Sequence, residues 1–355
     1  MDNHSPGDAA LPRALHVCTI KVAHEGRLYA NGLQQLEVTV YVEMEDTVST
    51  GLMPTDAEFA SIVLVDYDAD DNRITEEANP SGWNAQSARN SYEMYPSAPR
   101  APEPPVPLAL GRTKTIYLTA STASLVEKER LQVAFEITSD TGTRSVSNGW
   151  HYAPDGTRTY IKAIDKSEVY ALAIKPEVYG AANFDLLPDL SAHGNSPFDD
   201  PFEALALAVV SNQNRPLSIK SMTCTPPGVI EWFPNRSNEV EPRYTGYVAP
   251  GQKTVNWLEA TFVPEATRPA YTGDSTDKGV FLLCNHPGIQ NIQTDPPRGD
   301  IAVEIVDAYG SPQRCKVTIS KDEYQELIIP GRAALTTAQE SRRASASTQE
   351  SDGDE

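Results

Sequence analysis

The sequence predicts an all-β protein made of two tandem β-sandwiches, Ig-like or jelly-roll-like, with a few short helices and disordered polar tails. Three observations lead to this prediction: apolar residues alternate with polar ones, short β-branched runs are separated by turn residues, and the 355-residue chain contains 28 prolines. Alternation with period two places apolar side chains on one face of a strand. Prolines interrupt helices, so long helices are not expected.

The clearest alternation covers residues 36–44, where five apolar side chains are separated by Glu, Thr, Tyr and Glu. Residues 15–24 form a second predicted strand, and Asn31-Gly32 between the two is typical of a hairpin turn. The further predicted strands are short, β-branched and bounded by Gly, Pro, Asn or Asp. They are residues 61–67, 113–119, 131–138, 157–164, 169–174, 202–210, 217–223, 253–263, 279–284, 301–309 and 314–319.

Three short helices are expected at strand ends. Thr55 with Glu58, and Ser320 with Glu323, have the spacing of a capping box, in which two side chains bond each other's backbone N–H groups. Residues 124–130 are the third candidate. None of these segments continues for more than about two turns of helical periodicity.

The chain length favours two domains, at about 100–200 residues each. A weak internal echo, residues 111–116 against 251–255, agrees with two sandwiches of similar plan. The tails lack the apolar side chains needed to offset the entropy of ordering. The predicted organisation is a disordered arm 1–12, a first sandwich 13–165, a second sandwich 166–332, and a disordered acidic tail 333–355 rich in Ser and Thr.

The formal charge of −20, from 49 acidic and 29 basic residues, argues against nucleic acid as a partner. Phosphate binding requires clustered Lys and Arg, and the sequence shows no basic stripe. The N-terminus has no apolar core of a signal peptide. No apolar run approaches the roughly 18 residues of a membrane-spanning helix. The expectation is a protein without an integral membrane segment, cytoplasmic or released without a classical signal peptide.

The four cysteines are Cys18, Cys224, Cys284 and Cys315, and no two of them form a CxxC pair. This spacing excludes the common zinc and thioredoxin patterns. Free, buried thiols are expected, and a Cys284–Cys315 disulfide is left open as an alternative. No cofactor is expected.

One segment has the spacing of calcium ligands: Asp66, Asp68, Asp70, Asn72 and Glu77 occupy positions that match an EF-hand loop. The context is different, because Asp71 replaces the glycine of the sharp turn and a strand precedes the segment. Asp and Asn are also frequent in simple turns. The favoured interpretation is a solvated hairpin tip without bound metal.

The sequence contains no Gly-x-Ser-x-Gly elbow, glycine-rich phosphate loop or HExxH pair. No catalytic residue is therefore assigned. Trp83, with Tyr92 and Tyr95 downstream, lies in a polar segment, and aromatic residues on loops often serve recognition. These three are the candidate binding residues. The alternative is that Trp83 folds back to close one end of its sandwich.

The favoured function is a non-catalytic interaction or assembly protein that binds another protein or a glycan, or self-associates into a homo-oligomer. The first alternative is a component of a leaderless bacterial protein toxin that acts on host cells or membranes. The second is a hydrolase whose site is assembled between the domains. A fold of this kind does not by itself specify which of these holds.

The calcium interpretation is directly testable. A loop that bound Ca²⁺ would stabilise the fold by about 2.7 kcal/mol at a hundredfold excess over the dissociation constant. That is several degrees in melting temperature, readily seen by calorimetry. We expect equal melting temperatures in millimolar Ca²⁺ and in chelator. An upward shift in Ca²⁺ that disappears in Asp68→Ala would contradict this expectation.

Overall fold

The computed structural model describes residues 13–46, 48–77, 80–96, 111–160, 169–189, 191, 202–234, 240–258, 268–285, 297–321 and 326–331. Two compact units share the chain; the main division falls between Pro176 and Glu177, and Tyr309–Ser311 group with the first unit. The predicted disordered segments, 1–12 and 333–355, lie outside the described residues.

The smaller sheet of the first unit contains four antiparallel strands in the order β1-β3-β7-β6. Their bounds are β1 Ala14–Val22, β3 Gln35–Glu45, β7 Arg112–Ala120 and β6 Trp83–Gln86. The alternation in β3 is confirmed, because its apolar residues from Leu36 to Met44 have no exposed surface. They pack in one core with residues of the larger sheet, including Phe135.

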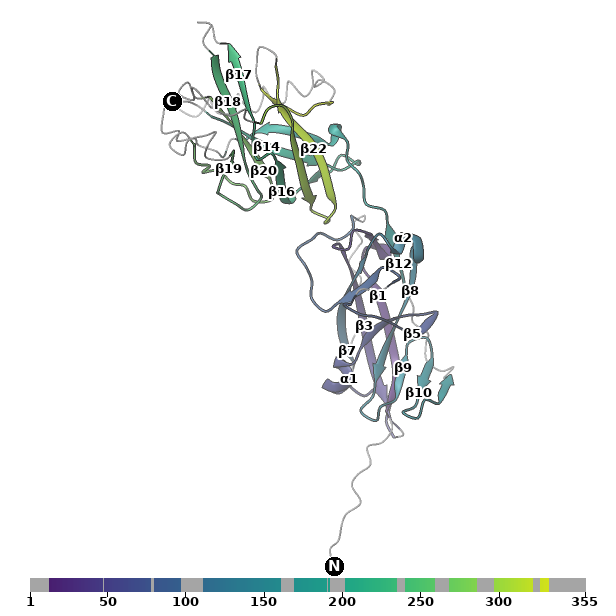
Figure 1. Cartoon of the computed structure of the whole chain (residues 1–355). Helices are drawn as coiled ribbons and strands as arrows, with labels where there is room; N and C mark the ends of the chain where they lie inside the picture. Colours follow the sequence, from purple (N-terminus) through teal and green to yellow (C-terminus); the bar gives the residue numbers. More distant parts are fainter. Residues whose placement is uncertain are drawn as a thin grey trace, which may run out of the picture. The chain divides into compact units, whose positions relative to one another are not determined.

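The larger sheet of this unit follows the path β11-β10-β9-β8-β12-β2, with β4 paired to β8 and β5 to β4 (Figure 1). Its strands are β11 Arg158–Tyr160, β10 Trp150–Tyr152, β9 Arg144–Val146, β8 Arg130–Thr138, β12 Val169–Ile174, β2 Arg27–Tyr29, β4 Val63–Asp66 and β5 Ala69–Ile74.

The hairpin predicted around Asn31-Gly32 is only partly correct. Strands β1 and β3 do pair antiparallel, and Gly32 has the positive φ of 77° that a turn glycine accepts. Between them, however, β2 leaves for the other sheet and pairs parallel with β12. The connection therefore crosses between the two layers instead of closing a two-residue turn.

The short helices agree with the sequence where they are described. Helix α1, Asp56–Ala60, carries the predicted capping box: the Thr55 hydroxyl accepts a bond from the Glu58 N–H, and the Glu58 carboxylate accepts from the Thr55 N–H. Helix α2 is Ser124–Glu127. Two 3₁₀ turns are η1 His24–Gly26 and η2 Ala181–Asn183. The second predicted capping box includes Glu323, which lies outside the described residues.

The second unit is also a sandwich of two sheets. The larger sheet follows the order β13-β14-β20-β18-β17, with the two-residue strands β15 and β19 attached to β14 and β18; the smaller sheet follows the order β16-β21-β22-β23. The bounds are β13 Phe184–Pro188, β14 Glu203–Val210, β15 Pro216–Leu217, β16 Ile219–Thr225, β17 Ile230–Pro234, β18 Val240–Val248, β19 Asn256–Trp257, β20 Gly279–Asn285, β21 Ile301–Asp307, β22 Pro312–Ile319 and β23 Leu327–Ile328.

The structure differs from the sequence prediction in several details, and strands β5, β6, β9, β10, β13 and β17 are among those that were not predicted. Strand β12 follows the boundary expected at residue 165, yet it pairs with β8 and β2 and so lies in the first unit. The strand predicted over 253–263 is described only at Asn256–Trp257, and 253–255 are not extended in a sheet. Strand β18 was not predicted, because Pro242 and Gly246 interrupt its apolar pattern.

The predicted fold class is confirmed: the protein is all-β and consists of two β-sandwiches with a few short helices. Within the described residues, no helix is both long and apolar enough to cross a membrane. The core of the first unit lies between its two sheets. The second unit has a corresponding core and a further apolar cluster built around Ile230, Tyr244 and Leu282.

The capping box of α1 supplies a stability test. Thr55→Ala removes the hydroxyl that accepts the Glu58 N–H, and loss of such a cap lowers the free energy of unfolding by about 1 kcal/mol. Thr55→Ser keeps the hydroxyl and is the matched control. Urea denaturation should show the loss in the alanine variant alone; equal losses in both variants would show that the cap bond is not responsible.

Candidate functional site

The most distinctive surface feature of the second unit is an incompletely paired edge on β22. Strand β23 pairs with β22 only at Thr318 and Ile319, and among the described residues no other strand pairs with that edge. After Ile329, the chain continues with Pro330 and Gly331, and Gly331 has φ 81°. Proline has no N–H to donate and a left-handed residue cannot continue a strand, so the pairing ends there.

The ladder fixes which backbone groups of β22 face this edge. The Ser320 N–H donates to the Glu326 carbonyl, so Ser320 faces β23. Main-chain groups alternate in direction along a strand, and therefore Thr318, Lys316 and Arg314 face the same side. The intervening Cys315 and Val317 face β21, their partner strand. Arg314 and Lys316 thus present their N–H and C=O groups to the unpaired edge.

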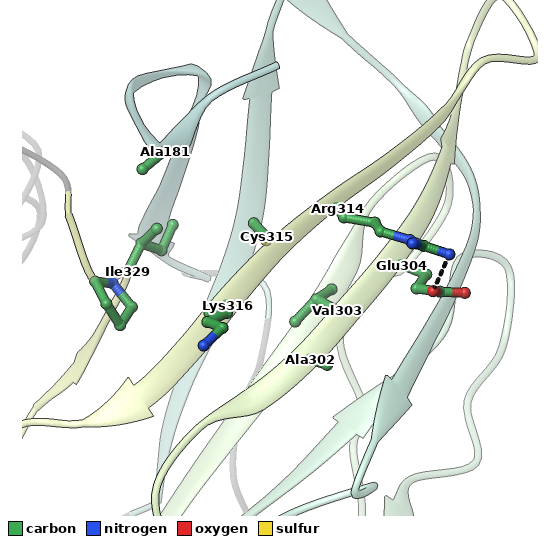
Figure 2. A pocket seen from close by; sticks show the side chains of 9 residues that line it. Ala181, Ala302, Val303, Glu304, Arg314, Cys315, Lys316 and Ile329 are labelled. Atoms are coloured by element: carbon green, nitrogen blue, oxygen red, sulfur yellow. Dashed lines mark ion pairs between the residues drawn. The ribbon is translucent and has the colours of Figure 1, made fainter. Parts of the chain in front are cut away.

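A cavity of about 360 Å³ borders this part of β22. Figure 2 shows Ala181 and Ile329 on one side of it and β22 with Cys315 on the other. Val303 and Ile329 are buried, and Cys315 is half-buried. The complete lining is Ala181, Ala302, Val303, Glu304, Arg314, Cys315, Lys316, Ile329 and Pro330. An apolar cavity therefore lies directly beside backbone groups suited to hydrogen bonding.

Charged side chains mark the outer face of the same strands. Arg314 on β22 pairs with Glu304 on β21 at 2.8 Å, as Figure 2 shows, and Lys316 pairs with Asp300 at 2.9 Å. All four side chains are well exposed, so each pair adds little to stability. The row across the sheet is acidic on the β21 side and basic on β22, next to the unpaired edge.

The alternative of a Cys284–Cys315 disulfide is wrong, since all four cysteines are free. Cys284 packs in the apolar cluster around Tyr244 and Leu282, whereas Cys315 packs against the core between the two sheets. The two side chains therefore belong to different apolar clusters of the second unit. Burial raises the pKa of the Cys315 thiol to about 12 and also raises that of Cys284.

The residues with the spacing of calcium ligands, for which a solvated turn without metal was the favoured interpretation, lie on or just after the hairpin of β4 and β5. Asp66 is buried and its carboxylate pairs with the Lys128 ammonium at 2.5 Å, while its second oxygen accepts the Asp68 N–H. Asp68, Asn72 and Glu77 are exposed, and the side chain of Asp70 is outside the described residues. No cluster of three or more metal-ligating side chains is present in the described part of the chain.

Of the three candidate aromatic residues, Trp83 is excluded as an exposed binding residue. It is fully buried in the first core, and its indole N–H donates to the Lys128 carbonyl at 2.7 Å. Tyr92 and Tyr95 are half-buried, and the Tyr95 ring lies 5.0 Å from that of Tyr29. The alternative that Trp83 folds back into its sandwich is the one that holds.

A second group of aromatic side chains, which was not among the candidates predicted from the sequence, lies on strands β10 and β11. The Trp150 ring meets Tyr160 edge-on, and the Arg158 guanidinium lies 3.6 Å above the Trp150 centroid. Arg144 lies over Tyr152 in the same way. Sugars stack on free aromatic faces, and here arginines occupy ring faces, so this surface is less suited to a glycan.

A Ser–His pair in the first unit bears on the hydrolase alternative. The Ser145 hydroxyl and His151 Nδ1 are 3.1 Å apart, as in a nucleophile and its base. Both side chains are almost fully buried, and burial lowers the pKa of His151. A substrate does not reach a serine enclosed in this way, so we assign the pair a structural role.

The sequence did not single out the β22 edge, although one signal was present. Arg314, Cys315, Lys316 and Val317 alternate in polarity, and a Pro-Gly dipeptide follows the short apolar run 327–329. Pro-Gly is typical of a turn. That this turn ends the partner of β22 depends on the strand order, which local sequence does not disclose.

Comparison with known proteins gives little further guidance. No protein-family model matches the chain, and no curated protein matches it. Among solved structures, the sialic acid binding region of a Streptococcus sanguinis SK1 adhesin, bound to 3'sLn, is similar at 8% identity. The alignment covers 84% of this chain and 76% of that one, with a TM-score of 0.23. At this level of similarity no property is carried over.

The state of the thiols can be tested by titration with Ellman's reagent. We expect four reactive thiols per chain in guanidinium without reductant, because all four cysteines are free. In the native protein at pH 8, Cys315 should react on the order of a hundredfold more slowly than a model thiol, since its raised pKa leaves little thiolate. Two thiols in guanidinium would reveal a disulfide and contradict the structure.

Proposed function

We propose that this protein is a non-catalytic binding protein whose second β-sandwich accepts an extended segment of a partner protein along β22. The observation that carries the proposal is the unpaired edge at Arg314–Lys316 beside an apolar cavity of about 360 Å³. An extended peptide that adds to a sheet edge gains main-chain hydrogen bonds for affinity and side-chain pockets for specificity.

The unpaired part of β22 matches the size of a short peptide segment. It runs from Pro312 to Lys316, about 17 Å at the rise of an antiparallel strand. An added strand takes the direction that β23 has, antiparallel to β22. Its residue opposite Cys315 then faces the cavity. The neighbouring residues bond Arg314 and Lys316 through the main chain.

The other hypotheses receive less support. Glycan binding at the Trp150 surface is less favoured because arginine side chains cover faces of the Trp150 and Tyr152 rings. The hydrolase hypothesis is less favoured because the Ser145–His151 pair is buried. No described feature favours the toxin hypothesis. A reducing compartment is part of our proposal, supported by four free cysteines in a chain of 355 residues.

Selection from a display library of random heptapeptides against the intact chain tests the proposal. Selected peptides are synthesised, and their affinities are measured by fluorescence anisotropy. Lys316→Pro removes the N–H that faces the edge, and Lys316→Ala keeps it. We expect proline to weaken binding at least about tenfold more than alanine, because strand addition needs that donor.

N-methylation of the peptide gives the complementary measurement. In an added strand, every second N–H group points to β22. Methylation of these N–H groups should abolish binding, whereas methylation of the N–H groups that point away from β22 should not. Circular dichroism and melting curves confirm that Lys316→Pro folds. If no selected peptide binds, or if proline and alanine have equal effects, strand addition at this edge is refuted.

A further inference from the structure

We infer that the strand accepted by β22 carries acidic side chains on both sides of an apolar one, and that it is not the β22 strand of a second copy of this chain. The inference rests on the proposed function and adds the chemistry of the partner. It follows from the alternation of side chains along β22 and from the charges on its outer face.

The apolar position is set by the cavity. Cys315 is half-buried on the inward face of β22, and Val303 lies directly opposite it on β21. On an added strand, the residue opposite Cys315 continues this row across the sheet, because directly paired residues point to the same face. An aliphatic side chain such as Val matches a lining of Val303, Ile329 and Ala181.

The acidic positions are set by the outer face. The residues that flank the apolar one lie opposite Arg314 and Lys316, whose side chains are 80% and 63% exposed. Glu304 and Asp300 lie on the far side of β22 from the added strand. Acidic residues on that strand complete a row of alternating charge: Glu304, Arg314, then a carboxylate. Opposite charges directly across a sheet are favourable, and like charges are unfavourable.

The same charges argue against the β22 strand of a second copy at this edge. Two β22 strands paired antiparallel place the Arg314 and Lys316 side chains of one copy opposite those of the other. Four cations then gather on one face, and charged residues on an edge strand are a known obstacle to edge-to-edge association. An acidic partner meets no such repulsion. The edge therefore excludes self-pairing and admits a strand of opposite charge.

Two synthetic peptides test the charge pattern. They share one extended frame of threonine and serine and differ at the centre, Glu-Val-Glu in one and Lys-Val-Lys in the other. On the full-length protein we expect the acidic peptide to bind about fivefold more tightly, the size expected for two exposed cross-strand pairs. The double variant Arg314→Glu with Lys316→Glu should reverse the preference, and Arg314→Gln with Lys316→Gln should erase it.

The outcomes separate this inference from the proposed function. Equal binding of both peptides that is abolished by Lys316→Pro overturns the charge pattern and leaves strand addition intact. Absence of binding by either peptide, together with failure of the library selection, overturns both. A concentration-dependent dimer that Lys316→Pro abolishes and that Arg314→Gln with Lys316→Gln strengthens, measured by sedimentation, shows two β22 strands paired with each other and overturns the exclusion of self-pairing. Arg314→Glu places a carboxylate next to Glu304 and can disturb the fold. Melting curves are therefore recorded for the charge-reversed variant and for the Arg314→Gln, Lys316→Gln variant, which keeps the site neutral and serves as the folding control.

Discussion

The second unit depends on one constraint: every strand of a sheet either pairs on both sides or presents an edge to solvent. Strand β22 pairs with β21 from Pro312 to Val317, whereas β23 pairs with it only at Thr318 and Ile319 before Pro330 and Gly331 turn the chain away. Within the described residues, no strand pairs with the backbone groups of Arg314 and Lys316 on this side. The cavity, the exposed charges and the half-buried Cys315 all lie beside this stretch.

Alternating polarity made the fold class predictable, because burial of one strand face is decided locally. Strand β3 shows this best, with every apolar residue of 36–44 buried as the pattern indicates. Strand β18 shows the limit. Pro242 lies beyond the ladder to β20, which begins at Arg243, and the Trp257 ring covers Gly246 where a Cβ would clash. In the sequence, Pro242 and Gly246 indicate interruptions of a strand. Both are tolerated in β18 because of how the neighbouring strands pair and pack there.

The candidate site was less predictable than the fold, because it depends on which distant strands pair and not on local alternation. Trp83 lies among polar residues in the sequence, but β6 pairs with β7 and carries the ring into the core. Asp66 reads as a metal ligand until Lys128, from a distant part of the chain, pairs with it. The only local signals of the β22 edge are alternating polarity over 314–317 and the Pro330-Gly331 dipeptide, and neither identifies the strand that lies beside β22. Sites formed by strand order require long-range pairing, which alternation alone does not specify.

An acidic partner for a protein of formal charge −20 requires that local charges outweigh the total. Charges separated by more than about 8 Å are largely screened at physiological ionic strength. Neighbouring strands lie only about 4.8 Å apart. Arg314 and Lys316 are therefore within the range that decides the interaction, whereas the distant carboxylates mainly slow the approach of an acidic segment. Overall charge sets the rate of encounter and the edge sets the preference. A negative chain is therefore compatible with an edge where Arg314 and Lys316, each paired with one carboxylate on the β21 side, present exposed cations to an acidic strand.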